Sequence, residues 1–406
     1  MANDANAPRV LDGIRVVDFT RIMAGPYATM MLADHGADVV KVEGLPGGDA
    51  ARQFGLDYVG DQSAVYLMWN RNKRSVALDL RSAEAKAIVH RLIAQADVVV
   101  ENYRPGVAEK IGFGYDELSR VNPRLVYCSI SAFGSSGPMA DLPGTDPVVQ
   151  AASGIMSVTG AGDGDPSLVG VPIADFTGAM TAVQGVLLAL LARERTGRGQ
   201  RVEVSMLHAL LASLTTRLAT FWTTGVNPPR TGSAHSVIVP YQVFRTKDGD
   251  VMAGAWRAES WDSFCEAMEL PELATDARFG TNIDRQAHRA VLMPILQAAF
   301  EQRTTAEWEQ RFRDAGALFA RVNTFSDIFG HPHVRESGIV QRLQHPTLGE
   351  LPALAPPAVL SDTPATLATA APLLGQHTRE ILAEAGCSEA EIDDLHARGI
   401  ARTTVP

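Results

Sequence analysis

Asp175 stands alone among apolar and small residues in the stretch VGVPIADFTGAMTAVQG (169–185), and no lysine or arginine follows it before Arg193. An aspartate at the start of a helix is a common N-cap, because its side chain accepts a hydrogen bond from an unpaired backbone amide. A carboxylate without a neighbouring cation is also free to act as a nucleophile. The two roles are compatible, and the residue type and its position leave both open.

Two further segments carry polar groups that suit a nucleotide ligand. MWNRNKRS (68–75) concentrates Arg71, Lys73 and Arg74 beside two asparagines, and such cations bind phosphate strongly; a solvated loop before a strand is the alternative. ENYRPG (101–106) offers Asn102 and Tyr103, an amide and an aromatic ring that could bind a base, with a plain turn as the alternative.

Short apolar strands alternate with helices through the first third of the chain. This pattern predicts a parallel sheet covered on both faces, and therefore an α/β fold with a Rossmann-like layer. Ligands of such sheets bind at the carboxyl ends of the strands, where residues 101–106 lie. The predicted strands are 13–20, 37–43, 75–80, 97–102 and 124–133, and the predicted helices are 24–36, 82–96 and 114–122.

The rest of the chain predicts a second domain. A long helix is expected after residue 176, then a strand over 200–206 and one helix over 207–222. A shift to Gly and Pro at 223–233 marks a boundary. We expect three parts: 1–222 in a large domain, 223–325 in a smaller mixed α/β domain with a hairpin turned at Asp248–Gly249 and three helical stretches, and 326–406, which ends in a helix pair.

Composition narrows the class of protein. Of the 406 residues 46% are apolar and 20% charged, and the net charge of −10 argues against nucleic acid or an anionic membrane as a partner. Residues 1–10 lack the apolar core of a signal peptide, and the apolar run 178–192 is too short to cross a bilayer, so we interpret it as a buried helix. Three widely separated cysteines fit a reducing cytoplasm without disulfides.

Several common motifs are absent from the sequence. The segment after the first predicted strand reads TRIMAGP rather than GxGxxG, and there is neither a P-loop nor GxSxG. A nicotinamide or flavin dehydrogenase is therefore not expected. His331 and His333 lack a nearby third ligand, so we expect no metal.

Taken in order along nearly the whole chain, the segments resemble the class III CoA-transferases (the CaiB/BaiF type, a superfamily of formyl-CoA and carnitine CoA-transferases that also includes α-methylacyl-CoA racemase). The resemblance rests on LDGIRVVDFTRIMAGPYATMMLADHGADVVKVE, NRNKRSVALDL, ADVVVENYRPG, IGFGYDEL, ISAFGSSGP, DFTGAMTAVQGVLLALLARERTGRGQRVEVSM and LLGQHTREILAEAG. It implies a large domain built from both chain ends, with 326–406 returning to it, a smaller middle domain, and two chains interlocked as a homodimer.

The resemblance also implies a reaction and its residues. Asp175 stands where these enzymes have a nucleophilic aspartate that forms a mixed anhydride and then an aspartyl-CoA thioester, moving CoA from an acyl-CoA to a small carboxylic acid. CoA is then a substrate, with no tightly bound cofactor. Asp146 matches a position that is acidic in several members and would order the site. The implied CoA contacts are Ile22, Met23, Ala24, Arg71, Lys73, Asn102, Tyr103, Lys110 and Ile111.

The sequence departs from the formyl-CoA transferases at three places. Met23 replaces Gln, Gly44 replaces an Arg, and MAGAWRAESW (252–261) lacks their glycine-rich loop. We therefore do not expect oxalate or formyl-CoA as substrates. Met23 and Trp256 instead favour a larger or less polar acyl group.

The rival function is an α-methylacyl-CoA racemase, which keeps the same aspartate. Racemisation needs a second acid/base, a histidine in those enzymes, but this chain has Thr145 there, and a hydroxyl is too weak a base. A CoA-binding protein without activity is the third possibility, and an intact Asp175 argues against it.

Overall fold

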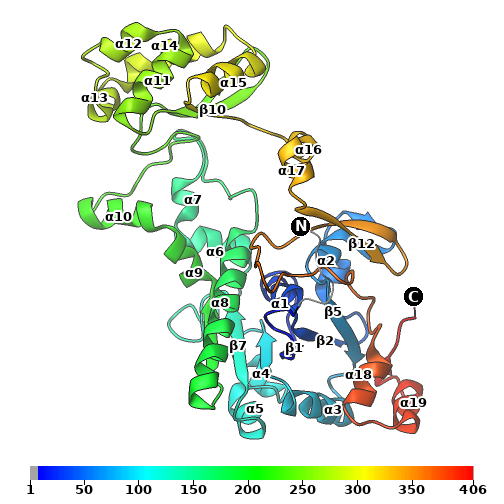
Figure 1. Cartoon of the computed structure of the whole chain (residues 1–406). Coiled ribbons are helices and arrows are strands. Elements are labelled where there is room, and N and C mark those ends of the chain that lie inside the picture. Colours follow the sequence, from blue (N-terminus) through cyan, green and yellow to red (C-terminus); the bar gives the residue numbers. More distant parts are fainter. Residues whose placement is uncertain (1–7, 406) are drawn as a thin grey trace. The chain divides into compact units, whose positions relative to one another are not determined.

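The computed structural model describes residues 8–405, which form two compact units. The first unit holds the described residues up to Ile155, Val169–Ala219 and those from Arg335 onward; the second holds Met156–Leu168 and Thr220–Val334. The first and the last parts of the described chain therefore belong to the same unit (Figure 1). Residues 1–7, on which the signal-peptide prediction largely rests, lie outside the described residues.

A seven-stranded sheet forms the centre of the first unit, in the order β14-β5-β2-β1-β6-β7-β8. The six longer strands are parallel, and β14 pairs antiparallel with β5 at one edge. The predicted parallel α/β layer is confirmed, and only the two-residue β14 had no signal in the sequence. The strands are β1 (Arg15–Asp18), β2 (Asp38–Gly44), β5 (Lys73–Leu78), β6 (Val98–Glu101), β7 (Val126–Ser131), β8 (Arg201–Ser205) and β14 (Ala401–Arg402).

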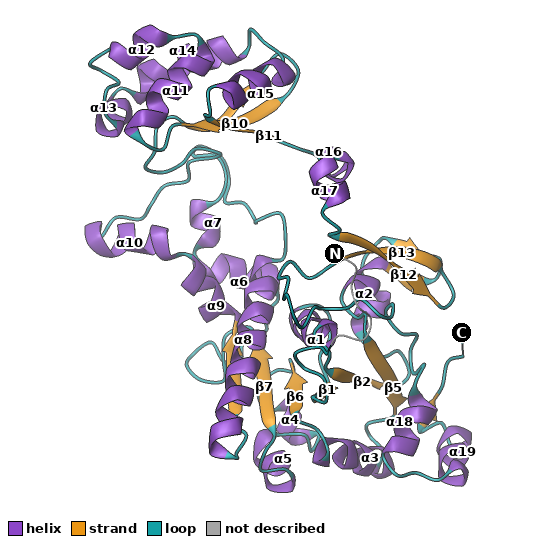
Figure 2. Cartoon of the chain, viewed as in Figure 1, coloured by secondary structure: helices purple, strands orange, loops and turns teal. Residues whose placement is uncertain are grey.

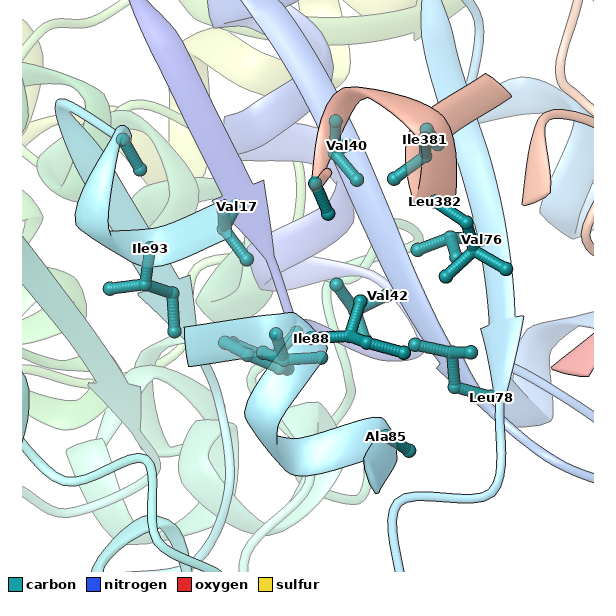
Figure 3. Packing of buried hydrophobic residues seen from close by; sticks show 14 of the residues in the cluster. Val17, Val40, Val42, Val76, Leu78, Ala85, Ile88, Ile93, Ile381 and Leu382 are labelled. Carbon is teal, nitrogen blue, oxygen red and sulfur yellow. The ribbon is translucent and has the colours of Figure 1, made fainter. Parts of the chain in front are cut away.

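Helices cover both faces of this sheet (Figure 2). On one face, apolar side chains of the strands pack against four helices, two of which come from the end of the chain; Figure 3 shows Ile381 and Leu382 beside Val76 in this cluster. These helices are α3 (Ala83–Ala94), α5 (Tyr115–Val121), α18 (Thr378–Glu384) and α19 (Glu389–Ala397). The terminal helix pair thus completes the core of the large unit.

The helices α1 (Ala24–Asp34), α8 (Ile173–Thr196) and α9 (Met206–Ser213) lie together elsewhere in this unit, with α1 against β1, β2 and β6 and α8 against β7 and β8. Tyr27 and Phe176 join α1 to α8, with ring centroids 5.0 Å apart in an edge-on arrangement. Gly178 lets α9 approach α8, because a Cβ there would lie 2.9 Å from Met206 Cγ.

Two helix predictions need correction. The apolar run 178–192 is the middle of α8, which at 24 residues is long and apolar enough to cross a membrane by length and composition, although it packs on the sheet here. The single helix expected over 207–222 is two helices, α9 and α10 (Thr215–Thr224), which meet at Leu214.

The remaining elements of the first unit are short. They are η1 (Ala50–Gln53), β3 (Tyr58–Val59), β4 (Gln62–Ser63), α2 (Ala64–Met68), α4 (Val107–Lys110), α6 (Asp146–Ser153) and the hairpin of β12 (Val340–His345) and β13 (Gly349–Leu354). Two helices, α7 (Ile155–Val158) and α17 (Pro332–Glu336), span a boundary between the units, as does α10.

The second unit has its own core around a three-stranded antiparallel sheet, β11-β10-β9. The hairpin of β9 and β10 turns at Asp248 and Gly249, as the sequence predicts. Five helices rather than three lie between β10 and β11. The elements are β9 (Tyr241–Arg245), β10 (Asp250–Gly254), α11 (Ala258–Met268), α12 (Pro271–Thr275), α13 (Asn282–Ala287), α14 (Arg289–Phe300), α15 (Thr305–Asp314), β11 (Leu318–Arg321) and α16 (Phe325–Gly330).

Candidate active site

A cavity of about 230 Å³ lies in the first unit beyond the carboxyl ends of β1, β6 and β7. This is the edge at which open parallel sheets bind ligands. Loops after the three strands form its wall together with a segment before α6. Its lining includes Arg21, Ile22, Met23, Ala24, Asn102, Tyr103, Arg104, Phe133, Leu142, Thr145, Asp146, Asp175 and Met206.

Asp175 lies in the first turn of α8, two residues after the helix begins at Ile173. Within residues 8–405 we find no hydrogen bond or ion pair to its carboxylate. Burial raises the pKa of Asp175 to about 7, and the nearby charge of Asp146 adds to the rise. The cavity therefore holds a carboxyl group that ionises near neutral pH and is not neutralised by a bound cation.

Asp146 provides the cap that the sequence suggested for Asp175. It is the first residue of α6 and is buried, and its Oδ1 accepts hydrogen bonds from the backbone amides of Ala174 (2.7 Å) and Asp175 (3.3 Å). The interpretation of Asp175 as the helix cap is therefore wrong. The carboxylate that satisfies the first amides of α8 comes from another helix, so the Asp175 side chain stays free.

Gln150 holds Asp146 in place. Its Nε2 donates to Asp146 Oδ2 at 2.7 Å, and its Oε1 accepts from the amide of Val169 at 3.0 Å. Gln150 was not predicted as a site residue, although it stands four residues after Asp146 in a helical stretch, the spacing at which side chains on one helix face meet.

The predicted contacts after β1 and β6 come together at the cavity. Ile22, Met23 and Ala24 form one part of the wall, and Asn102 and Tyr103 form another. The Asn102 side chain, however, is bonded to the backbone of Arg21, accepting from its amide and donating to its carbonyl, both at 2.8 Å. Asn102 therefore shapes the wall, and Tyr103 is the freer of the two predicted base-binding groups.

Two arginines at the cavity escaped the sequence analysis. Arg21 and Arg104 both line it and are exposed, and the guanidinium carbon of Arg21 lies 5.1 Å from the centroid of the Tyr103 ring. Arg21 lies in TRIMAGP and Arg104 in ENYRPG, each next to a predicted CoA contact. Their place in these segments could have identified them as site residues. They give the cavity positive charge in an acidic protein.

Arg71 and Lys73 of the cationic cluster lie outside the lining of this cavity, and both are buried in ion pairs. Lys73 is fully buried, and its ammonium donates to Asp18, to Asn70 and to the carbonyl of Pro26 at 2.9–3.0 Å. Arg71 is paired with Asp34 at 2.7 Å. These cations stabilise buried carboxylates, so we leave Arg71 and Lys73 out of the proposed CoA site.

The third cation of this cluster, Arg74, joins β2 to α18. Its guanidinium is paired with Asp38 of β2 and with Glu380 and Glu384 of α18, at 2.7–2.8 Å.

The predicted contacts Lys110 and Ile111 lie at the end of α4, outside the cavity lining. Lys110 is exposed, and Ile111 packs against the sheet's apolar cluster.

Thr145 lines the cavity beside Asp146, and none of the described lining residues is a histidine. Among residues 8–405 no three His, Cys, Asp or Glu side chains gather as metal ligands. Trp256, which together with Met23 is predicted from the sequence to favour a larger or less polar acyl group, belongs to the second unit. The first unit thus defines an α/β enzyme site built around one free carboxylate and two nearby arginines.

Comparison with known proteins gives the class of reaction. The family model described as CoA-transferase family III matches residues 11–378. A Mus musculus succinyl-CoA:glutarate CoA-transferase is 38% identical over 98% of this chain and 92% of its own length, and an Acetobacter aceti acetyl-CoA:oxalate CoA-transferase is 40% identical over 75% of this chain and 78% of its own.

A solved structure agrees with these relatives. A CaiB/BaiF family protein from Brucella suis superimposes with a TM-score of 0.84 at 34% identity, covering 93% of this chain and 100% of that one. The chain belongs to CoA-transferase family III. It is an enzyme of the CoA-transferase class, as the resemblance predicted.

Proposed function

We propose that the protein moves CoA from an acyl-CoA thioester to a free dicarboxylic acid, with Asp175 as the nucleophile. The observation that carries this proposal is a carboxylate in a cavity at the ligand-binding edge of the sheet, with its helix capped by another residue and with no cation from the described part of the chain paired to it. Such a group can attack a carbonyl carbon and later leave from it.

The reaction needs four acyl transfers and no net proton. The Asp175 carboxylate attacks the thioester carbonyl; the carbon–sulfur bond breaks, leaving a mixed anhydride and CoA thiolate. The thiolate attacks the Asp175 side-chain carbonyl, which releases the first acid and forms an aspartyl-CoA thioester. The acceptor carboxylate attacks that thioester to form a second anhydride and thiolate. The thiolate then takes the new acyl group and regenerates the Asp175 carboxylate.

The two relatives guide the choice of substrates. One is a succinyl-CoA:glutarate enzyme and the other an acetyl-CoA:oxalate enzyme, so a dicarboxylic acid accepts CoA in both names. Arg21 and Arg104 at the cavity could bind either the second carboxylate of such an acid or a CoA phosphate. Succinyl-CoA or acetyl-CoA as donor and glutarate as acceptor are the first pairs to test. Met23 argues against oxalate, which belongs in the panel for that reason.

Racemisation at the α-carbon is the second candidate, and Thr145 disfavours it. A proton removed from one face must be returned to the other by a second group of suitable pKa. Thr145 occupies the place expected for that group, and the cavity's described lining offers no histidine.

We further propose a homodimer in the cytoplasm, with the interlocked chains that the resemblance implies. An apolar stripe on α8 supports association. Its side chains Met180, Leu187, Leu188 and Leu191 are 41–58% exposed. Several exposed apolar side chains on one helix face are typical of an interface with another protein chain.

The experiment is a matrix of acyl-CoA donors against free acids in D2O, read by mass spectrometry. Exchange of CoA between acids without deuterium at the α-carbon supports the transferase. Deuterium incorporation without exchange would identify a racemase and overturn the proposal.

A further inference from the structure

The wall of the cavity between β1 and α1 is a turn with an unusual backbone. Ile22 has φ of +66°, in the left-handed region. A β-branched side chain is a rare occupant of that region, because its Cβ crowds the backbone. Residues 21–24 all line the cavity with Asp175, so the shape of the turn sets the shape of this wall.

Three side chains from three other places in the sequence hold the turn. The buried Lys41 ammonium donates to the carbonyl of Thr20 at 2.8 Å, and Asn102 bonds both backbone groups of Arg21. Asp49 Oδ1 accepts from the amide of Ile22 at 3.0 Å, the residue with the strained backbone. Each of three consecutive residues therefore has a backbone group fixed by a distant side chain.

Asp49 links these contacts into one buried network. Its Oδ2 forms an ion pair with Lys41 at 2.9 Å, and both side chains are 1% exposed. Its own amide donates to Glu43, which is paired with Arg52. Burial alone would raise the pKa of Asp49, but Lys41 and the amides of Ala51 and Ile22 hold it below its ordinary value, so the group is ionised.

The turn is also closely packed against the helix it precedes. A Cβ on Gly25 would lie 2.3 Å from Thr20 Cβ, so the chain can double back here only because residue 25 is glycine. Glycine thus stands at the crowded position, while Ile22 takes the left-handed backbone with the help of Asp49.

We propose that Asp49 is a positioning residue for CoA transfer, which holds Ile22 in its left-handed conformation and so sets the cavity wall that faces Asp175. This inference deepens the proposed function and rests on it. Asp49 does not line the cavity itself. It acts on the reaction through the backbone of residues 20–23.

The test is a double-mutant cycle between Asp49→Ala and Ile22→Gly, measured on kcat and on KM for the acyl-CoA. Asp49→Ala should lower kcat/KM by about 100-fold, as expected when a group that positions a substrate moves by about 1 Å. Glycine adopts the left-handed region without strain, so the same Asp49→Ala change should cost less than about tenfold when residue 22 is glycine. An equal loss in both backgrounds would overturn the proposal, since an ion pair that only stabilises the fold does not depend on the residue at 22.

Asp97→Ala is the matched control. Asp97 likewise accepts a hydrogen bond from a backbone amide, that of Arg15, and pairs with a buried cation, Arg193, at 2.9 Å. It lies, however, at the amino ends of β1 and β6, whereas the cavity lies beyond their carboxyl ends. It should lower Tm while leaving kcat/KM within about twofold of wild type. A loss of kcat/KM as large as that of Asp49→Ala would overturn the inference.

Asp49→Asn covers the case in which Asp49→Ala does not fold. Asparagine keeps an oxygen for the amide of Ile22 and loses the charge that pairs with Lys41. We expect a lower Tm with kcat/KM within about threefold of wild type; a 100-fold loss would contradict a role through the Ile22 bond. Isothermal titration measures how well each variant binds CoA. Asp175→Ala tests the proposed function independently, because it should abolish transfer whatever the role of Asp49.

Discussion

Asp175 has the properties that covalent chemistry on a carboxylate requires. It lines a cavity, no cation among residues 8–405 pairs with its carboxylate, and its pKa is raised to about 7 by burial and by Asp146. The residue and its motif were predictable from the sequence. The raised pKa was not, because it depends on burial and on a second carboxylate that stands 29 residues earlier in the chain.

The pH dependence of the reaction follows from that ionisation. Only the carboxylate form attacks, so kcat/KM should fall as pH drops below about 7. At pH 6 it should be about a tenth of the plateau reached at pH 8, since one pH unit is a tenfold change in ionised fraction. Initial rates from pH 5.5 to 8.5 check this. A profile that stays flat down to pH 5.5 would exclude a carboxyl group with this pKa as the nucleophile.

At the scale of elements, α6 and α8 act as a pair. Asp146 at the start of α6 caps the start of α8 and also adds to the pKa rise of Asp175. The sequence predicts α8 and its first turn, and it offers Asp175 as a possible cap, but the structure gives that role to Asp146. Local propensity identifies a residue able to cap; which carboxylate does so is decided by the tertiary contact between the helices.

Two substitutions at Asp146 separate its two effects. Asp146→Asn removes the charge but keeps an oxygen for the amides of α8, so the acid limb of the pH profile should move to lower pH. Its Nδ2 then faces the donor Nε2 of Gln150, so Tm should also fall. Asp146→Ala removes the cap as well and should lower the free energy of unfolding by about 1 kcal/mol more. pH–rate profiles and thermal melts of both variants provide the measurement. An acid limb that stays in place in Asp146→Asn would contradict the electrostatic coupling.

The ion pairs of the cationic cluster around Lys73 could not be predicted from the sequence. Three basic residues among polar neighbours predict a ligand site or an exposed loop. In the structure, each of them pairs with carboxylates from elsewhere in the unit. Those partners, Asp18, Asp34 and Asp38, lie 36 to 55 residues away, and nothing local identifies them.

At the scale of the whole molecule, the alternation of strands and helices predicts the parallel sheet correctly. The antiparallel β14, the extra helices of the second unit and the membership of Met156–Leu168 in that unit had no local signal. Such features depend on long-range packing. That both chain ends share one unit came from the resemblance rather than from the pattern of residues.

The proposed homodimer gives a prediction at this scale. Light scattering after size exclusion should report twice the chain mass of 43.5 kDa. Leu188→Glu, which places a charge on the exposed apolar stripe of α8, should reduce the dimer or its yield. Val121→Glu, at an apolar position at the end of α5 that is 48% exposed against 58% for Leu188, is the control and should leave the mass unchanged. A wild-type protein of single-chain mass would contradict the dimer.

Trapping the covalent intermediate on Asp175 tests its role as the nucleophile. Hydroxylamine added during turnover with succinyl-CoA and glutarate should inactivate the enzyme and convert Asp175 to a hydroxamate, a mass change of about 15 Da on the peptide that contains it. Asp175→Ala should show neither turnover nor the adduct, while still binding CoA. Turnover in Asp175→Ala, or a hydroxamate on another carboxylate, would show that Asp175 is not the nucleophile.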